Sequence, residues 1–582
     1  MTSSNPPPGK TARRAPQGLA GGLTDYGDRD FALYLRRSFA RSMGYTGTAL
    51  ERPIVGICTS ESGFNNCHRH FPELIEAVKR GVLAAGALPV VFPVISLGEV
   101  FLSPASMVYR NLMAMAVEEM IRAQPMDAVV VLGGCDKTVP AMLMGAISAE
   151  KPAAMVVAGP MMTGRHRGER LGACTDCRRF WGNFRAGSIG GDEIAQIEGR
   201  LAVTAGTCAV MGTASTMALL AETLGMILPG SAAIPAVHAD RLRNAEETGT
   251  LIARMAREGG PLPAEVVTPA AIRNAMRVLL AVSGSTNAVI HLAAIAGRIG
   301  MRLDLDAFNR MSDETPVLVD LKPVGQGYME DFHHAGGLEG VLRGIAPMLE
   351  TETRAVSGET LAERLARPLA DPVDHAVIRP AADPVAREGG LIALSGTLAP
   401  GGAILKRAAA TPALLEHEGR AVVFTSLADL AARIDAPDLD VTAADVLVLQ
   451  NAGPKSPSGM PEAGYLPIPR KLAQAGVKDM LRISDARMSG TAFGTIVLHV
   501  TPEASIGGPL SLVRDGDRIR LSAREKRIDL LVAPEVLAAR AAEPRRAQPV
   551  AERGYARLHN ERVLPATEGC DFDFLQGGKQ AR

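Results

Sequence analysis

The chain lacks the features that would bring it to a membrane or to nucleic acid. Its 582 residues include 62 basic and 62 acidic residues, so there is no net charge to attract a polyanion. The chain contains no run of about 18 apolar residues, the length that crossing a bilayer requires. Its first 25 residues also lack the apolar core of a signal peptide. We therefore expect a cytoplasmic protein with no nucleic-acid or membrane partner.

Cysteine is also scarce, with seven in the whole chain. An odd and sparse set argues against a disulfide framework and favours reduced thiols that bind metal or pack in the core. Cys58 follows an apolar run and Cys570 lies near the C-terminus, so both are interpreted as packing residues. Cys174 and Cys177 have the CxxC spacing of redox pairs and zinc sites, but several nearby arginines favour a structural or substrate-facing loop.

The length exceeds what a single core usually holds and predicts at least two domains. From about residue 50 to 350, apolar runs alternate with helical patterns, as in an α/β domain with a mostly parallel sheet between helical layers. From about residue 381, short apolar runs are divided by Gly and Pro, which indicates a smaller β-rich domain. We predict a flexible tail over residues 1–30, an α/β domain over 31–370 and a β-rich domain over 381–582.

The expected elements can be placed from the apolar patterns. Four runs are typical of buried parallel strands: 53–58, 88–94, 128–132 and 153–158. Segments 71–85 and 104–123 have helical spacing, and 360–366, inside the proline-rich joint, fits a short helix as well as a linker. In the second half, the expected strands are 390–394, 420–424, 445–449, 481–484, 495–500, 518–521 and 528–531.

Three cysteines lie in polar segments far apart in the sequence, and Cys135 has the most informative surroundings. A buried strand leads into Gly-Gly-Cys-Asp-Lys-Thr-Val-Pro at 133–140, where the carboxyl end of a strand and the start of a helix favour a bound ligand. Cys67, which precedes His68, and Cys208 each fit a ligand role or a core position equally. Three thiolates from separate loops would suit an iron–sulfur cluster with one open iron.

The chain resembles the dihydroxy-acid dehydratase and sugar-acid (aldonate) dehydratase family, which includes phosphogluconate dehydratase. The motifs are the run at 133–140, Ala-Gly-Thr-Cys-Ala-Val-Met-Gly-Thr-Ala-Ser-Thr-Met at 205–217 and Asp-Ala-Arg-Met-Ser-Gly-Thr at 485–491. The resemblance implies a [2Fe–2S] cluster, or in some branches [4Fe–4S], bound by Cys67, Cys135 and Cys208. It also implies a barrel-like C-terminal domain and assembly into a homodimer or homotetramer.

The same resemblance implies a magnesium ion beside the cluster. Its ligands would be Glu99, Asp136, Lys137 and Glu462, with Lys137 carbamylated by CO₂ so that it offers an oxygen. Hard oxygen ligands are the kind that Mg²⁺ prefers, which agrees with this set.

The resemblance implies that Ser489 is the catalytic base and that Thr491 helps to orient it or the substrate. On the residues alone, Ser-Gly-Thr after a short strand is also typical of a plain turn. His68 is expected near the site, as a neighbour of the ligands or a substrate contact. Asp485 and Arg487 are expected to brace the serine turn.

These groups suit the removal of water from a 2,3-dihydroxy carboxylate. Mg²⁺ would stabilise the enolate and the open iron would accept the departing hydroxyl as a Lewis acid. We predict a hydro-lyase that converts a small hydroxy acid, with a sugar acid such as a pentonate favoured, to a 2-keto-3-deoxy acid. The alternatives are dehydration of 2,3-dihydroxyisovalerate in branched-chain amino-acid biosynthesis, a broad-range enzyme, and a non-catalytic iron–sulfur sensor, which would have no use for the carboxylates.

Overall fold

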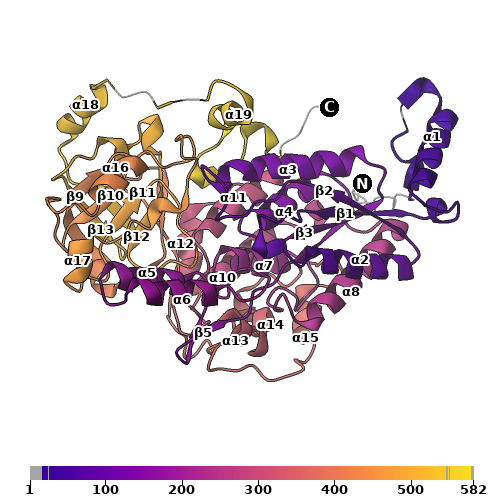
Figure 1. The fold of residues 1–582 in the computed structure, drawn as a ribbon, viewed down its shortest axis with the longest axis horizontal. Helices are drawn as coiled ribbons and strands as arrows, with labels where there is room; N and C mark the ends of the chain where they lie inside the picture. The colour runs from indigo at the N-terminus through magenta and orange to yellow at the C-terminus, as the bar shows by residue number, and fades with distance from the viewer. Residues whose placement is uncertain (1–15, 24, 545–547, 550, 578–582) are drawn as a thin grey trace, which may run out of the picture.

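The computed structural model describes residues 16–23, 25–544, 548–549 and 551–577, and it places an α/β domain beside a β-rich domain (Figure 1). Residues 1–15 of the predicted tail lie outside the described residues. From Gln17 the chain is joined to the α/β domain, because the Asp127 carboxylate accepts hydrogen bonds from the backbone of Gln17 at 2.7 Å and of Gly18 at 3.1 Å.

The α/β domain contains the predicted parallel sheet, in the order β2-β1-β3-β4. Its strands are β1 (Ile54–Thr59), β2 (Leu88–Pro93), β3 (Ala128–Gly133) and β4 (Ala153–Val157). Strands β1, β3 and β4 are buried along their whole length, which explains their unbroken apolar sequences. Helices α2 (Phe71–Ala84) and α8 (Ala239–Glu258) cover one face, and α3 (Ser106–Ala123) and α4 (Thr138–Ser148) cover the other (Figure 1).

After β4 the structure differs from the alternation expected up to residue 350. A small hairpin of β5 (Gly164–His166) and β6 (Glu169–Leu171) is followed by helices, because the apolar runs of this region belong to helical rather than strand periodicity. These helices are α5 (Thr175–Arg185), α6 (Gly191–Leu201), α7 (Thr213–Thr223), α9 (Pro263–Val266), α10 (Pro269–Ala281), α11 (Asn287–Arg298), α12 (Leu305–Glu314), α13 (Met329–His334), α14 (Gly337–Gly344) and α15 (Leu361–Ala366).

The β-rich domain is built on an eight-stranded mixed sheet in the order β14-β13-β9-β10-β11-β12-β8-β7. A bridge between Ser395, directly after β7, and Arg527 on β14 joins the two edges, so the sheet is nearly closed and barrel-like as expected. The strands are β7 (Ile392–Leu394), β8 (Gly402–Leu405), β9 (Glu416–Phe424), β10 (Val446–Leu449), β11 (Arg482–Ser484), β12 (Ile496–Thr501), β13 (Arg518–Ser522) and β14 (Arg527–Leu530). Helices α16 (Leu427–Arg433), α17 (Arg470–Gln474) and α18 (Pro534–Ala542) lie outside the sheet.

The end of the chain returns to the α/β domain. Helix α19 (Gly554–Arg562) packs on α3, where the Tyr555 hydroxyl donates to the backbone oxygen of Val108 at 2.7 Å. Further on, Asp571 forms a buried ion pair with Arg298 of α11 at 2.7 Å. The two domains are therefore tied together by the last described segment as well as by the joint.

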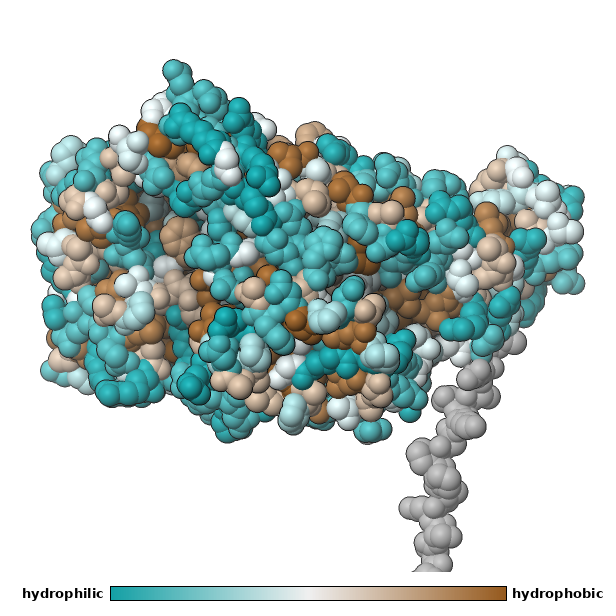
Figure 2. Space-filling model, turned by 90° about the horizontal axis from the view of Figure 1, so that it is seen from below, coloured by the Kyte–Doolittle hydropathy of each residue, from teal (hydrophilic) through white to brown (hydrophobic). Residues whose placement is uncertain are grey.

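Helix α1 (Arg29–Ser42) projects from the α/β domain at the end away from the β-rich domain (Figure 1). Several of its large apolar side chains are exposed, among them Tyr34, Phe39 and the following Met43. On the face drawn in Figure 2, hydrophobic residues elsewhere lie in small groups among hydrophilic ones. Among the described residues, no helix combines the length and the apolar composition that a bilayer span requires.

Candidate active site

Four thiols meet where the loops after β1 and β3 face the loop before α7. Cys67 lies in a single helical turn after β1, Cys135 follows β3, and Cys208 lies in the loop before α7. A side-chain hydrogen bond with Cys135, together with burial, raises the pKa of Cys67 well above its usual value. Cys174, at the start of α5, is the fourth thiol, with its Sγ 3.5 Å from Sγ of Cys208. The sequence predicted three of these residues as neighbours and did not include Cys174.

His68 holds the Cys135 loop in place. Its Nδ1 donates to the backbone oxygen of Ser60 at 2.7 Å, and its Nε2 accepts from the backbone N–H of Cys135 at 3.2 Å. Burial lowers the pKa of His68 to about 4, so the ring is neutral. The backbone can pass this close because residue 134 is glycine: a Cβ there would lie 2.5 Å from the Cβ of Ala158.

The predicted magnesium ligands also come together. Ligand oxygens of Glu99, Asp136 and Glu462 all lie within 4.8 Å of one another. Oxygens on opposite sides of an octahedral Mg²⁺ are about 4.2 Å apart, so the three carboxylates fit one ion. Nζ of the fully buried Lys137 lies 3.4 Å from Glu99 and 3.7 Å from Asp136.

Arg487 connects these carboxylates. The sequence predicted instead that Arg487 would brace the serine turn. Its guanidinium donates to Glu99 at 2.5 Å and to Glu462 at 2.8 Å, although Glu99 and Arg487 are 388 residues apart. Burial alone would raise the pKa of Glu99, but Arg487 and Lys137 outweigh it and hold the pKa well below its usual range. For Glu462, burial and the nearby Glu99 charge dominate and raise the pKa to about 7. A divalent cation would relieve this crowding of acids.

The serine turn follows β11 and reaches the cysteine-bearing segments of the other domain. Ser489 Oγ lies 2.8 Å from Thr491 Oγ1, which accepts a hydrogen bond from Arg178 of α5 at 2.9 Å. Thr175 Oγ1, also on α5, donates to the backbone oxygen of Thr491 at 2.9 Å. Gly212 makes this approach possible, because a Cβ there would lie 2.8 Å from Thr491 Cγ2. The predicted turn thus lies at the contact between the domains.

Asp485, the first residue of the serine motif, has a structural position. Its buried carboxylate accepts from the backbone N–H groups of Ala452 at 3.0 Å and Ala504 at 2.8 Å. It therefore joins two loops of the β-rich domain, whereas the sequence predicted that it braces the serine turn.

Lys406 lies behind the serine turn, at the end of β8, and sequence reasoning did not single it out. The side chain is fully buried, and its Nζ lies 3.5 Å from the backbone oxygen of Gly490. Burial lowers the pKa of Lys406 to about 7 from a usual value of 10.5. An apolar strand end gives no sequence signal for such a contact.

We expect Lys406→Met to raise thermal stability. A buried lysine with a folded pKa near 7 and an unfolded value of 10.5 costs stability of the order of 4 kcal/mol below pH 7, because the side chain is then charged in both states and the folded chain must bury that charge. This cost falls as pH rises from 7 to 10.5. Calorimetry should therefore give a melting temperature several degrees above wild type at pH 6.5 and a smaller difference at pH 9.5. The control Lys406→Arg keeps the charge and should not stabilise; an equal gain at both pH values for Lys406→Met would contradict this explanation.

Polar atoms without partners also line this region. His291 on α11 is buried and its Nδ1 accepts from Arg110 at 3.1 Å, while its Nε2 has no hydrogen-bond partner among the described residues. Lys137 and Arg487 are close enough for their charges to lower the pKa of His291 further, after burial as the main cause. Asn287 Oδ1, one helical turn earlier, is likewise buried without a partner in the described part of the chain. Such atoms suit a polar ligand.

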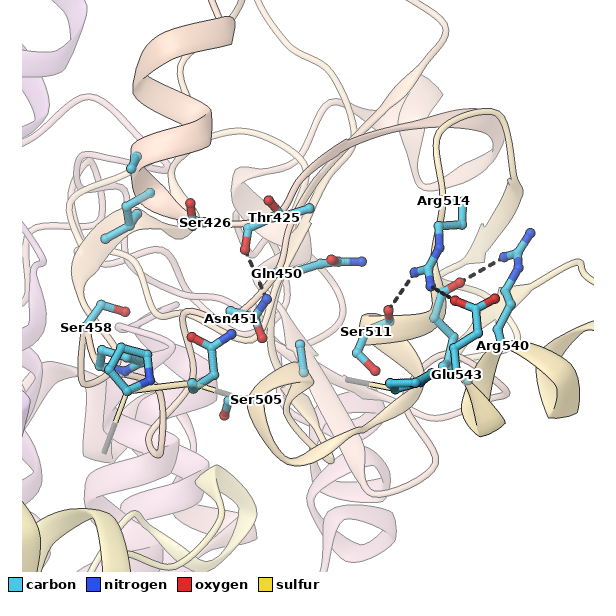
Figure 3. Close-up of a pocket in the computed structure, with 18 residues that line it drawn as sticks. Thr425, Ser426, Gln450, Asn451, Ser458, Ser505, Ser511, Arg514, Arg540 and Glu543 are labelled. Carbon is cyan, nitrogen blue, oxygen red and sulfur yellow. Dashed lines mark hydrogen bonds and ion pairs between the residues drawn. The ribbon is translucent and has the colours of Figure 1, made fainter. Parts of the chain in front are cut away.

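A separate cavity of about 620 Å³ lies in the β-rich domain and contains none of the predicted site residues. Figure 3 shows its wall, where Arg514 contacts Ser511 and Glu543, and Asn451 donates to the backbone of Thr425. The chemistry indicated by the thiols, the carboxylates and the serine lies elsewhere, at the contact between the domains.

Comparisons with known proteins agree with this geometry. The family model "Dihydroxy-acid/6-phosphogluconate dehydratase N-terminal" matches residues 52–364, and the corresponding C-terminal model matches residues 376–570. The chain is 46% identical to L-arabonate dehydratase of Azospirillum brasilense, over 96% of this chain and 97% of that protein. It is 44% identical to 6-deoxy-6-sulfo-D-gluconate dehydratase of Pseudomonas putida, over 91% of each.

A dihydroxy-acid dehydratase of Carboxydothermus hydrogenoformans is 37% identical, over 92% of this chain and 97% of that protein. The chain therefore belongs to the dihydroxy-acid and 6-phosphogluconate dehydratase family. The resemblance noted from the three motifs is confirmed.

Proposed function

We propose that the chain is a hydro-lyase that removes water from a 2,3-dihydroxy sugar acid, such as a pentonate, and forms a 2-keto-3-deoxy acid. The observation that carries this proposal is the meeting of three donor sets at one place: thiols, carboxylates and a serine turn. No single set defines the reaction, but together they match what the dehydration requires.

Cys67, Cys135 and Cys208 would hold an iron–sulfur cluster, for which we propose the [2Fe–2S] type with [4Fe–4S] as the alternative. The donor set fits, because reduced thiols from separate loops are adjacent. When bound, the cluster would supply a Lewis acid for the hydroxyl that leaves C3. His68 would then act through Cys135 by fixing its loop.

Glu99, Asp136 and Glu462 would hold Mg²⁺, which would stabilise the enolate that forms as C2 loses its proton. Nζ of Lys137 lies among these carboxylates, and because an ammonium group has no lone pair for a metal, the side chain would join the ligands only after modification to an oxygen donor. We propose carbamylation of Lys137 for this reason, since the adduct replaces a positive ammonium by a carbamate. Arg487 would keep Glu99 and Glu462 oriented.

Ser489 would take the proton from C2. Since Arg178 donates to Thr491 Oγ1, the hydroxyl hydrogen of Thr491 is available to Ser489 Oγ. This short chain ends on a guanidinium and favours negative charge on Ser489, as a base requires. Thr491 therefore orients the serine, and Arg178 is a positioning residue.

A sugar acid is favoured over a branched-chain substrate for two reasons. The site is surrounded by polar groups, including Thr175, Arg178 and two buried atoms without a partner in the described part of the chain, Oδ1 of Asn287 and Nε2 of His291, which suit additional hydroxyl groups. Identity is also higher to the two sugar-acid dehydratases than to the dihydroxy-acid dehydratase. The second candidate function is dehydration of 2,3-dihydroxyisovalerate, alone or within a broad substrate range. The similarity to the dihydroxy-acid dehydratase of Carboxydothermus hydrogenoformans supports it.

We propose that the enzyme forms a homodimer or homotetramer in the cytoplasm. The exposed apolar side chains of α1 have the character of a surface covered by a second copy. All seven cysteines are free thiols, which suits a reducing compartment.

The proposal is tested by assaying keto-acid formation with anaerobically purified enzyme supplied with iron and Mg²⁺. Pentonates, hexonates and 2,3-dihydroxyisovalerate should be compared in parallel. We expect turnover of at least one sugar acid with a higher kcat/KM than for dihydroxyisovalerate. The reverse preference would favour the biosynthetic candidate, and no turnover of any substrate with an intact cluster would favour a sensor.

Removal of Mg²⁺ should abolish turnover and leave the cluster in place, because carboxylates and thiolates form separate donor sets. Treatment with a chelator should eliminate keto-acid formation without changing the visible absorption, and added Mg²⁺ should restore activity. Glu462→Gln should raise the Mg²⁺ concentration needed for half-maximal activity at least tenfold. Full activity in the presence of the chelator would contradict the magnesium assignment.

A further inference from the structure

Cys174 occupies a position that the three-cysteine description of the site does not explain. Its Sγ lies 3.5 Å from Sγ of Cys208, far longer than a disulfide bond of about 2.05 Å. Two thiolates on one tetrahedral metal ion, with metal–sulfur bonds of about 2.3 Å as for zinc, lie about 3.8 Å apart. The spacing of Cys174 and Cys208 is thus close to that of two ligands on a shared metal.

Cys67 and Cys135 share a side-chain hydrogen bond, and Cys174 shares one with Cys177 and one with Cys208. The charge of Cys67 contributes, after Cys174 and burial, to the raised pKa of Cys208, so these thiols lie close together. A [2Fe–2S] cluster held entirely by cysteine needs four thiolates, two on each of its irons.

We propose that Cys174 is a fourth thiolate ligand of the cluster in the substrate-free enzyme, on the iron that Cys208 holds. This inference rests on the proposed function, because it needs a cluster at Cys67, Cys135 and Cys208. Cys174 is the first cysteine of the CxxC pair. The sequence favoured a structural or substrate-facing loop for this pair, so the ligand role is a different one.

The surroundings of Cys174 would allow it to leave the iron when a substrate hydroxyl takes its place. The iron–sulfur bond would break with both electrons remaining on sulfur, so the product is a thiolate. Arg178, four residues on in α5, supplies a neighbouring positive charge and donates to the backbone oxygen of Cys174 at 3.3 Å. The start of α5, an 11-residue helix, also favours negative charge.

The same segment reaches the proposed base. Arg178 donates to Thr491 Oγ1 at 2.9 Å, and Thr175, next to Cys174, donates to the backbone oxygen of Thr491 at 2.9 Å. Helix α5 is itself fixed to the β-rich domain, because Arg185 forms two hydrogen bonds to Asp435 at 2.8 Å and 2.7 Å. Cys174 is therefore held between the cluster ligands and the serine turn, and movement of its side chain needs no movement of the domains.

The test compares Cys174→Ser and Cys174→Ala with Cys177→Ser, which removes the other thiol of the same CxxC pair. After anaerobic purification, iron and sulfide per chain, visible absorption and the electron paramagnetic resonance spectrum of the reduced cluster are measured. We expect both Cys174 variants to show shifted spectra and at least fivefold faster loss of iron in air, while Cys177→Ser resembles wild type. Unchanged spectra and unchanged air stability in the Cys174 variants would overturn the proposal.

A measurement on the wild-type enzyme keeps the proposal falsifiable if these variants fold poorly. In water labelled with ¹⁷O, the reduced cluster of substrate-free wild type should show no magnetic coupling to a water ligand, because Cys174 would occupy the position that water would otherwise take. Coupling to labelled water in the wild type would overturn the proposal. A wild-type enzyme that binds no iron at all would instead refute the proposed function, so the two failures are distinguishable.

Discussion

Replacement of Ser489 by Ala should reduce turnover by about 10²–10⁴-fold, the range that a positioned general base contributes. The change removes the Oγ that lies 2.8 Å from Thr491 Oγ1, and it leaves the thiols and carboxylates untouched. Iron content, visible absorption and melting temperature should therefore remain close to wild type. The measurement is kcat for keto-acid formation at saturating Mg²⁺.

Ser511→Ala is a matched control, since Ser511 lies in the same domain and its hydroxyl only donates to the backbone oxygen of Gly508 at 2.7 Å. It should have wild-type kcat. If Ser489→Ala retained activity within a few-fold of wild type, another group would have to remove the C2 proton, and the serine turn would have a purely structural role.

Cys135→Ser should abolish the visible absorption of the cluster and remove most of the bound iron. Serine offers an oxygen in place of a soft thiolate, and iron in such clusters is held chiefly by sulfur. The fold should persist, because the loop is fixed through the backbone N–H of Cys135, which binds His68 and Thr138. Iron per chain and the absorption spectrum are the measurements.

Cys58→Ala provides the comparison for loss of a buried thiol outside the site. Cys58 is buried in β1, where its Sγ contacts Met142 Sδ at 3.9 Å, so this change should cost about 1 kcal/mol of stability and no iron. An unchanged spectrum in Cys135→Ser would remove this residue from the ligand set.

Much of the fold could be predicted because its strands carry strong local signals. The four strands of the parallel sheet are continuous apolar runs, three of them buried along their whole length, and they lie where the sequence placed them. Strand β8 was missed, because Gly401 and Gly402 precede a run of only three apolar residues. The region after β4 was expected to contain more strands, because short apolar runs are similar in buried helices and buried strands.

The candidate site was predictable only where several reactive residues are adjacent in one sequence motif. Cys135, Asp136 and Lys137 are adjacent in sequence, so their common location follows from one loop. The pairing of Cys174 with Cys208 and the hydrogen bonds from Arg178 to Thr491 depend on the path of the chain in space. Lys406 could not be predicted, since its significance comes from the serine turn lying against a strand far away in sequence.

The central claim is that this site removes a proton from C2 and a hydroxide from C3 of one substrate. It is tested most directly by turning over a sugar acid in D₂O and determining the mass and deuterium position of the product. We predict a 2-keto-3-deoxy acid that is lighter by one water and carries solvent deuterium at C3, because the enol product takes a solvent proton at that carbon. A product that has lost hydrogen without loss of water, or one with no deuterium at C3, would contradict the proposed dehydration.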